Sequence, residues 1–141
     1  MTKGELAYNL FKEGNNCAQA VALAFKDELK LSEEDIKKLI IGFGGGFGRQ
    51  RLVCGAVSGM TMVLGYLKSD GVDKMSIYQI IQDACKEVKD ELGSLICAEL
   101  LDGADAIKTN PTPDERTAEY YKKRPCADIC KFVADITAKY L

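Results

Sequence analysis

The stretch GFGGGFGRQRLVCGAVSGMTMVLGYL, residues 42–67, decides the fold that we expect for this chain. Its first half is rich in glycine, which lets the backbone adopt φ > 0 and approach other groups closely. Residues 52–67 carry no charge and are apolar nearly all round, which predicts a buried helix. Gly55 and Gly59, four residues apart, would let the backbone of a neighbouring element approach one face of that helix closely. At about sixteen residues, it is shorter than the roughly 20 needed to cross a bilayer.

Length and charge narrow the classes of protein that fit. One chain of 141 residues is enough for a single domain with a real core. Its net charge of −2 gives no basic footprint, so we expect no nucleic-acid partner. We see no apolar leader and no membrane-length segment, and therefore expect a cytoplasmic protein without a membrane partner. In that compartment, six cysteines favour metal-binding, redox or catalytic roles over structural disulfides.

The chain contains no histidine. This absence excludes Ser–His and Cys–His catalytic pairs and any zinc site that uses imidazole. A thioredoxin-like Cys-x-x-Cys is also absent from the sequence. Any metal would have to be held by thiolates, carboxylates or backbone groups.

Apolar residues recur at helical spacing in the rest of the chain, without strand alternation of useful length. We predict helices over residues 3–13, 17–30, 32–41, 74–92 and 125–141, and shorter ones near 94–101 and 114–123. The expected fold is all-α, a single domain over residues 1–141. About six or seven helices would pack around the buried apolar helix at 52–67.

Three cysteines, Cys17, Cys54 and Cys126, fall near predicted helix N-termini. The helix dipole and free backbone N–H groups there should lower a thiol pKa and make thiolate available. We therefore predict Cys54 as an attacking thiolate and Cys17 or Cys126 as the cysteine that resolves a mixed disulfide. Cys85 lies on an apolar stripe and is interpreted as core, and Cys130 fits core or function equally.

The glycine cluster offers a second candidate site. The backbone of Gly44, Gly45 and Gly46 would approach a cofactor closely, and the alternative is a tight turn between packed helices. The cluster matches neither Gly-x-Gly-x-x-Gly nor a P-loop, so nucleotide binding is not expected. Arg49 and Arg51 would favour an anion or a thiolate, although charged loop residues are more commonly solvated.

The cysteines and their neighbours form a recognisable pattern. Its parts are Asn16-Cys17-Ala18-Gln19, Gly44-Gly45-Gly46-Phe47-Gly48, Cys54-Gly55-Ala56-Val57-Ser58-Gly59, Cys97 and Arg124-Pro125-Cys126. Over nearly its whole length the chain resembles the C_GCAxxG_C_C family of redox-active proteins. The resemblance implies redox activity and maps the family cysteines onto Cys17, Cys54, Cys97 and Cys126. The family name spells Gly-Cys-Ala-x-x-Gly, whereas this chain has Cys-Gly-Ala-x-x-Gly, and one position turns a helical side chain by about 100°.

Three functions remain open from the sequence. The first is thiol–disulfide chemistry at Cys54. The second is a thiolate-bound metal or iron–sulfur centre with Cys17, Cys54, Cys97 and Cys126 as ligands. If either of these two functions is enzymatic, the protein would be a thiol- or metal-dependent oxidoreductase. The sequence specifies neither a substrate nor an electron donor or acceptor. The third is a non-enzymatic helical interaction module with core cysteines, whose glycine-notched central helix would pack in a homodimer. We rank the two cysteine-based redox functions first.

Overall fold

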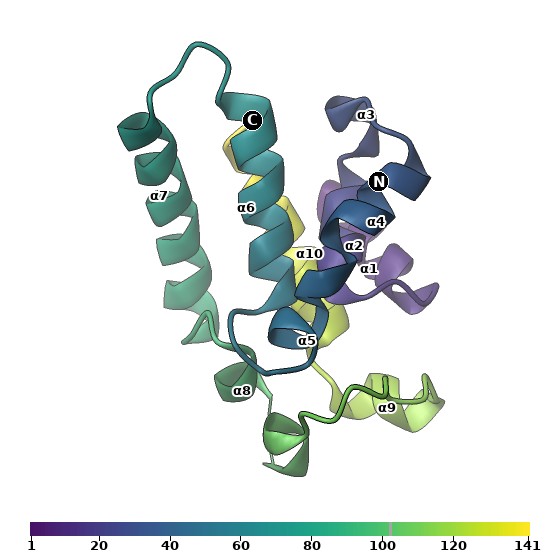
Figure 1. Cartoon of the computed structure of the whole chain (residues 1–141). Coiled ribbons are helices and arrows are strands. Elements are labelled where there is room, and N and C mark those ends of the chain that lie inside the picture. Colours follow the sequence, from purple (N-terminus) through teal and green to yellow (C-terminus); the bar gives the residue numbers. More distant parts are fainter. Residues whose placement is uncertain (102) are drawn as a thin grey trace.

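The structure is a computed structural model that describes residues 1–101 and 103–141 (Figure 1). Across these ranges the regular elements are helices, apart from one isolated antiparallel bridge between Val53 and Ile96. The predicted all-α fold is therefore confirmed. The elements are α1 (Lys3–Lys12), α2 (Cys17–Ala24), α3 (Lys26–Leu29), α4 (Glu33–Ile40), η1 (Ile41–Phe43), α5 (Gly44–Phe47), α6 (Gly55–Lys68), α7 (Lys74–Leu92), α8 (Cys97–Leu100), η2 (Gly103–Ile107), α9 (Ala118–Lys123) and α10 (Cys126–Lys139). No helix among the described residues is long and apolar enough to cross a membrane.

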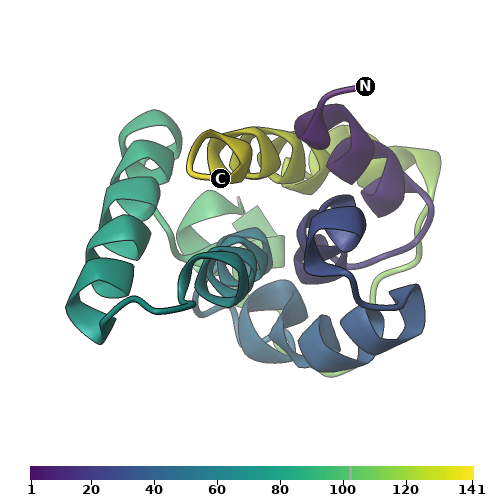
Figure 2. The same ribbon diagram turned by 90° about the horizontal axis from the view of Figure 1, so that it is seen from above.

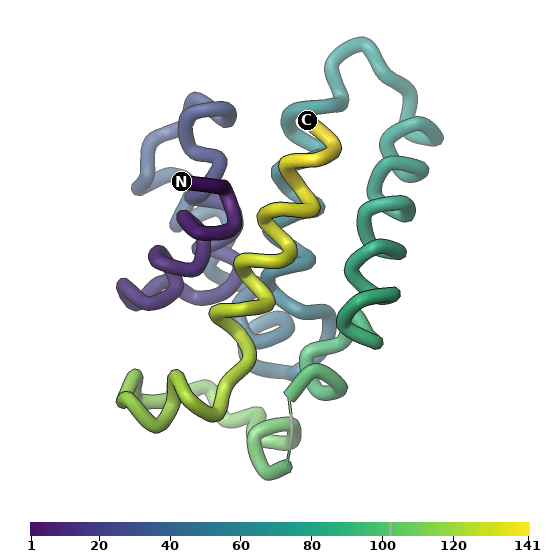
Figure 3. Tube along the Cα trace, turned by 180° about the vertical axis from the view of Figure 1, so that it is seen from behind, coloured from purple at the N-terminus to yellow at the C-terminus, as the bar shows by residue number. Residues whose placement is uncertain are grey.

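Three helices, α2, α6 and α10, run side by side in the same direction and form the centre of the bundle (Figures 1 and 3). Helix α1 packs on α2 and α10, α4 packs on α2, and α7 packs on α6 and α10 from the other side (Figure 2). The starts of α2, α6 and α10 consequently lie at one end of the bundle. The segment between α8 and α10 crosses this end.

Several predicted boundaries differ from the observed ones. The helix predicted over residues 17–30 is divided into α2 and α3 at Phe25, whose φ of −106° and ψ of 20° break the helix while its side chain is fully buried. The central helix begins at Gly55 rather than at Leu52, because residues 51–53 leave the helical conformation and pair with the chain before α8. Within α2, every residue from Ala18 to Ala24 is buried, so α2 is enclosed even more completely than α6, where Tyr66 is exposed.

The start of α2 is fixed by a reciprocal cap. The side chain of Asn16 accepts a hydrogen bond from the Gln19 backbone N–H at 2.9 Å, and the Gln19 side chain accepts one from the Asn16 N–H at 3.0 Å. The remaining amide donors bind Ile41 O at 3.1 Å and Lys37 O at 3.3 Å. The Asn-Cys-Ala-Gln sequence thus both starts α2 and joins it to α4 and η1.

The glycine cluster forms a left-handed turn. Five consecutive residues, 45–49, have φ between +61° and +73°, and Arg51 has φ of +63°. Such a turn costs roughly 1–2 kcal/mol for each residue that carries a Cβ, which explains why glycine occupies most of it. Gly46 also has no room for a side chain, because a Cβ there would lie 2.5 Å from Leu52 N.

Close contact between α2 and α6 depends on the glycines of α6. A Cβ at Gly59 would lie 2.9 Å from Ala18 O and 3.2 Å from Val21 Cβ. A Cβ at Gly55 would lie 2.5 Å from Cys17 Sγ and 2.9 Å from Phe43 O. The prediction that these two glycines open a face for backbone contact is confirmed.

Two glycines of α6 provide a matched test of this contact. Gly59→Ala should lower the free energy of unfolding by about 1–3 kcal/mol, because the new methyl group overpacks against the α2 backbone. Gly65→Ala should instead raise it by roughly 0.5–1 kcal/mol, since alanine is the better helix former and no atom lies within 4 Å of the new Cβ. Urea unfolding followed by far-ultraviolet circular dichroism measures both. Equal effects of the two substitutions would contradict the packing argument.

Candidate functional site

Four cysteines line one cavity of about 530 Å³ at the end of the bundle where the central helices begin. Cys17, Cys97 and Cys126 are the first residues of α2, α8 and α10, and Cys54 is the residue immediately before α6. Three of these helix starts agree with the sequence analysis. That of Cys97 does not, because the short helix predicted near 94–101 begins only at Cys97 itself.

Cys17 is the central thiol of the group. Its Sγ lies against Gly55, next in the chain to Cys54. Its charge, when ionised, would raise the pKa of Cys54, Cys97 and Cys126 alike, so all three lie within its electrostatic reach. All six cysteines of the chain are free thiols.

The other two cysteines lie outside the cavity lining. Cys130 is fully buried one helical turn after Cys126, and its Sγ donates to Cys17 O at 3.7 Å. It therefore packs against the backbone of Cys17. Cys85 is half-buried on α7, in agreement with its interpretation as a packing residue.

The expected low thiol pKa is wrong for Cys54 and Cys126. Burial raises the pKa of Cys54 well above its ordinary value, and repulsion from Cys17 adds to this, while hydrogen bonds from the backbone of Val57 and Ala56 offset only part. Burial, followed by repulsion from Cys17, raises the pKa of Cys126 to about 12. Desolvation thus outweighs the helix N-terminus, and in the absence of a bound cation these thiols are protonated at neutral pH.

Of the two interpretations of Arg49 and Arg51, the solvated one is wrong. Arg51 is only 5% exposed, and its Nε donates to Lys108 O at 2.9 Å while its Nη1 donates to Cys97 Sγ at 3.7 Å. This contact lowers the pKa of Cys97, although burial is the larger effect and leaves the pKa raised. Arg49 binds Asn110 O at 2.8 Å and Asp114 at 3.1 Å.

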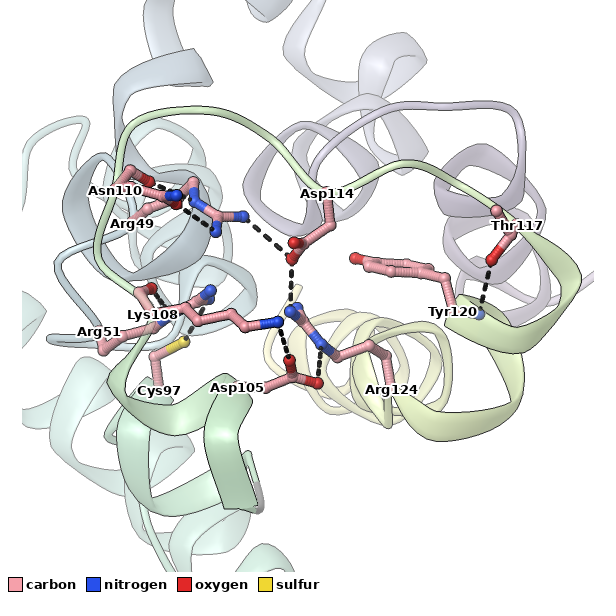
Figure 4. A network of polar contacts seen from close by, with 10 residues as sticks. All are labelled: Arg49, Arg51, Cys97, Asp105, Lys108, Asn110, Asp114, Thr117, Tyr120 and Arg124. Atoms are coloured by element: carbon pink, nitrogen blue, oxygen red, sulfur yellow. Dashed lines mark hydrogen bonds and ion pairs between the residues drawn. The ribbon is translucent and has the colours of Figure 1, made fainter.

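An ion-pair network holds the segment between α8 and α10 across the cavity (Figure 4). Asp114 accepts from both Arg49, at 3.1 Å, and Arg124, at 2.5 Å. Arg124 also pairs with Asp105 at 2.9 Å, and its side chain is only 6% exposed. Burial alone would raise the pKa of Asp114, but the two arginines hold it below its ordinary value. One carboxylate therefore joins the glycine-rich turn to the start of α10.

A further cation, Arg116, completes the cavity wall. Its guanidinium stacks 4.2 Å from the Phe11 ring centroid and 5.1 Å from that of Tyr120, and donates to Phe11 O and Asn15 O. Burial raises the pKa of Tyr120 to about 12. Sequence reasoning missed these residues because nothing in their local pattern indicates a site.

Among the residues that the structure describes, the cavity wall carries more positive than negative charge. The charged residues of this described lining are Arg49, Arg51, Arg116, Arg124 and Asp114. Helices α2, α6 and α10 add the positive ends of their dipoles at the same place. In a chain with a net charge of −2, this concentration of cations is local to the site.

The three glycines predicted to bind a cofactor do not all face the cavity. Gly44 and Gly45 line the cavity, with Gly44 packed against the Asn16 side chain. Gly46 is not part of the lining and packs against the backbone of Leu52. Their role toward a cofactor stays a prediction.

The arrangement of ligating side chains limits the kinds of metal site that fit. Over residues 1–101 and 103–141, no three Cys, Asp or Glu side chains are grouped closely enough to hold one metal ion. The four cavity cysteines surround a space instead of converging on a point.

Comparison with protein families identifies the chain. Residues 15–140 match the family model described as "Putative redox-active protein (C_GCAxxG_C_C)". The chain belongs to the C_GCAxxG_C_C family. Searches of curated proteins and of solved structures returned no match.

The central motif of the family has a different residue order in this chain. Because the order here is Cys-Gly-Ala, Cys54 precedes α6 and reaches the cavity from the turn before the helix. Gly55 then occupies the first helical position, where a side chain would collide with Cys17. The swapped order therefore keeps both the thiol at the cavity and the glycine at the contact.

Asp114 provides a pH-dependent test of the network. Asp114→Asn should lower the free energy of unfolding at pH 7 by about 1–3 kcal/mol, because buried Arg124 loses a charged acceptor. The carboxylate of Asp114 stabilises the fold above its unfolded pKa of about 3.9 and loses that effect as the pH falls through its lower folded pKa. The difference between wild type and variant, measured by urea unfolding, should therefore shrink below about pH 4.

The matched control is Glu119→Gln, which breaks an exposed ion pair with Lys123. It should change stability by less than about 0.5 kcal/mol. A cost for Asp114→Asn that is no larger than this control would show that the network does not hold the segment.

Proposed function

We propose that Cys17, Cys54, Cys97 and Cys126 form the redox centre of this protein, as thiolate ligands of an iron–sulfur cluster. The observation that carries the proposal is their shared position around one cavity. Four cysteines from sequence positions far apart line one cavity, in a chain that contains no histidine. Membership in a family described as redox-active supports the same class of function.

The donor set fits a cluster better than a single ion. Clusters are typically held by four cysteine thiolates. These bind different iron atoms, so they need not converge as closely as the ligands of one ion, for which no group of three is arranged among the described residues. A cavity of about 530 Å³ also falls within the range of cofactor and small-molecule sites.

The surrounding charge supports thiolate ligation. The buried thiols are protonated when no cation is present, and a bound metal displaces those protons. Four arginines and three helix N-termini would then stabilise the negative charge of the thiolates. When bound, the cluster supplies reversible electron transfer. Arg51 would donate to the Cys97 sulfur, and the segment between α8 and α10 would limit access of water.

A thiol–disulfide couple is the second candidate. The position of Cys17 within electrostatic reach of three other cysteines favours it, as does the free state of all six thiols. The raised pKa of Cys54 and Cys126 disfavours it, because attack on a disulfide requires a thiolate. We therefore rank it below the cluster.

The proposal is tested by iron and acid-labile sulfide analysis of protein purified without oxygen. We expect both in stoichiometric amounts, with a visible absorption that bleaches on reduction by dithionite. Serine at any one of the four cavity cysteines should remove most of the iron, because a ligand is lost. Cys85→Ser is the matched control, since Cys85 lies outside the cavity lining, and it should retain the wild-type content.

Each alternative gives a different result. Iron content that is unchanged in all four serine variants would contradict the ligand assignment. An absence of iron and sulfide, with cavity cysteines that oxidise in pairs, would favour the thiol–disulfide couple. Inert thiols with neither metal nor sulfide would favour the non-enzymatic helical module.

A further inference from the structure

Arg51 is a buried cation with incomplete partners. Its side chain lines the cavity although the residue is only 5% exposed. Its Nε is satisfied by Lys108 O and its Nη1 faces Cys97 Sγ, but its Nη2 is buried and has no hydrogen-bond partner among the described residues. A buried charged donor without an acceptor is costly, so an unfilled position of this kind points to a missing partner.

The other arginines of the cavity differ in whether they have a carboxylate partner. Arg49 pairs with Asp114, and Arg124 pairs with both Asp114 and Asp105. Within the part of the chain that the structure describes, neither Arg51 nor Arg116 forms an ion pair with a carboxylate. Two of the four cavity cations thus have no carboxylate partner among the described residues.

An oxyanion is the chemical group that meets this requirement. A guanidinium presents parallel N–H donors in a planar fork that matches carboxylate and phosphate oxygens. Cys97 Sγ takes a donor from Nη1 alone, so it leaves Nη2 for a second acceptor. We infer that the cavity binds a small molecule bearing an oxyanion group, held by Arg51 beside Cys97. If the proposed function is correct, this molecule is the substrate or electron-transfer partner of the cysteine centre.

The position of Arg51 suits such a role. Its carbonyl accepts from the Ala98 N–H at 3.2 Å and its N–H donates to Gly45 O at 3.1 Å, so the residue is held between the left-handed turn and α8. The apolar part of the cavity wall includes Ile41, Leu100 and Ile129. A ligand with a charged end and an apolar body would therefore contact Arg51 at one end and aliphatic side chains at the other.

Ligand-induced stabilisation of the reduced, metal-free protein tests the inference. Dithiothreitol keeps the thiols reduced without adding an anion, and sodium chloride matches the ionic strength. Inorganic phosphate and acetate are the two probes, one tetrahedral and one planar. At least one should raise the Tm above the chloride reference, and titration calorimetry with that probe should give a saturable Kd.

Three variants locate the binding. Arg51→Gln should weaken the binding of that probe by roughly tenfold or more, because a charge-assisted pair is lost. Arg51→Lys keeps the charge without the planar guanidinium, and an intermediate affinity would show that the guanidinium contributes more than its charge. Lys86→Gln removes an exposed cation on α7 and should leave the affinity unchanged.

The outcomes separate this inference from the proposed function. Because the assay uses metal-free protein, a failed search for iron leaves it intact, and the iron assay does not depend on anion binding. If neither probe raises the Tm of wild type above matched chloride, the oxyanion site is overturned. That result needs no variant and holds even where Arg51→Gln fails to fold. Equal binding by wild type and Arg51→Gln would also overturn it, and preference for phosphate or acetate would identify the oxyanion class.

Discussion

The site depends on the missing side chain at Gly55. The sulfur of Cys17 occupies the space that a Cβ at Gly55 would fill, and four residues later Gly59 lets α6 lie directly against the α2 backbone. This contact brings two helix starts together with their dipoles parallel. Helix α10 runs alongside in the same direction, so three positive helix ends and their cysteines meet at one end of the bundle. The arrangement of the thiols is therefore a consequence of glycine packing.

Charge is the second constraint on the site. Dehydration keeps the thiols neutral, while arginines from the left-handed turn and from the segment before α10 concentrate positive charge around them. Carboxylates neutralise only some of that charge. The same surplus would stabilise metal-bound thiolates and an incoming oxyanion, so the two proposals draw on one electrostatic feature and differ in which atoms supply the negative charge.

Local sequence patterns predicted most of the helices, but they gave no information about contacts between residues that are far apart in the sequence. Helix α7 is predicted over its observed range, Lys74–Leu92, and in the structure Asp73 caps its start and Gly93, with φ of +90°, ends it. Burial of Arg51 could not be predicted, since it depends on a carbonyl 57 residues away. Similarly, Arg116 and Arg124 reach the cavity wall through contacts formed only in the folded chain, Arg116 with the Phe11 and Asn15 carbonyls and Arg124 with Asp105 and Asp114. Motif spacing indicated the four cysteines, but it did not indicate the cations around them or the raised pKa that burial causes.

The segment that crosses the cavity begins and ends at the site it covers. Cys97 precedes it and Cys126 follows it, and both sulfurs face the same space. Between these two anchors, Arg49 binds Asn110 and Asp114, Arg51 binds Lys108 O, and Arg116 donates to Phe11 O, and these contacts attach the segment to the rest of the protein. The segment that covers the cavity is therefore anchored at both ends by residues of the cavity lining. If the proposed centre forms on these cysteines, any change that moves the sulfur of Cys97 or Cys126 would also move one end of this segment, which would couple the chemical state of the centre to access to the cavity.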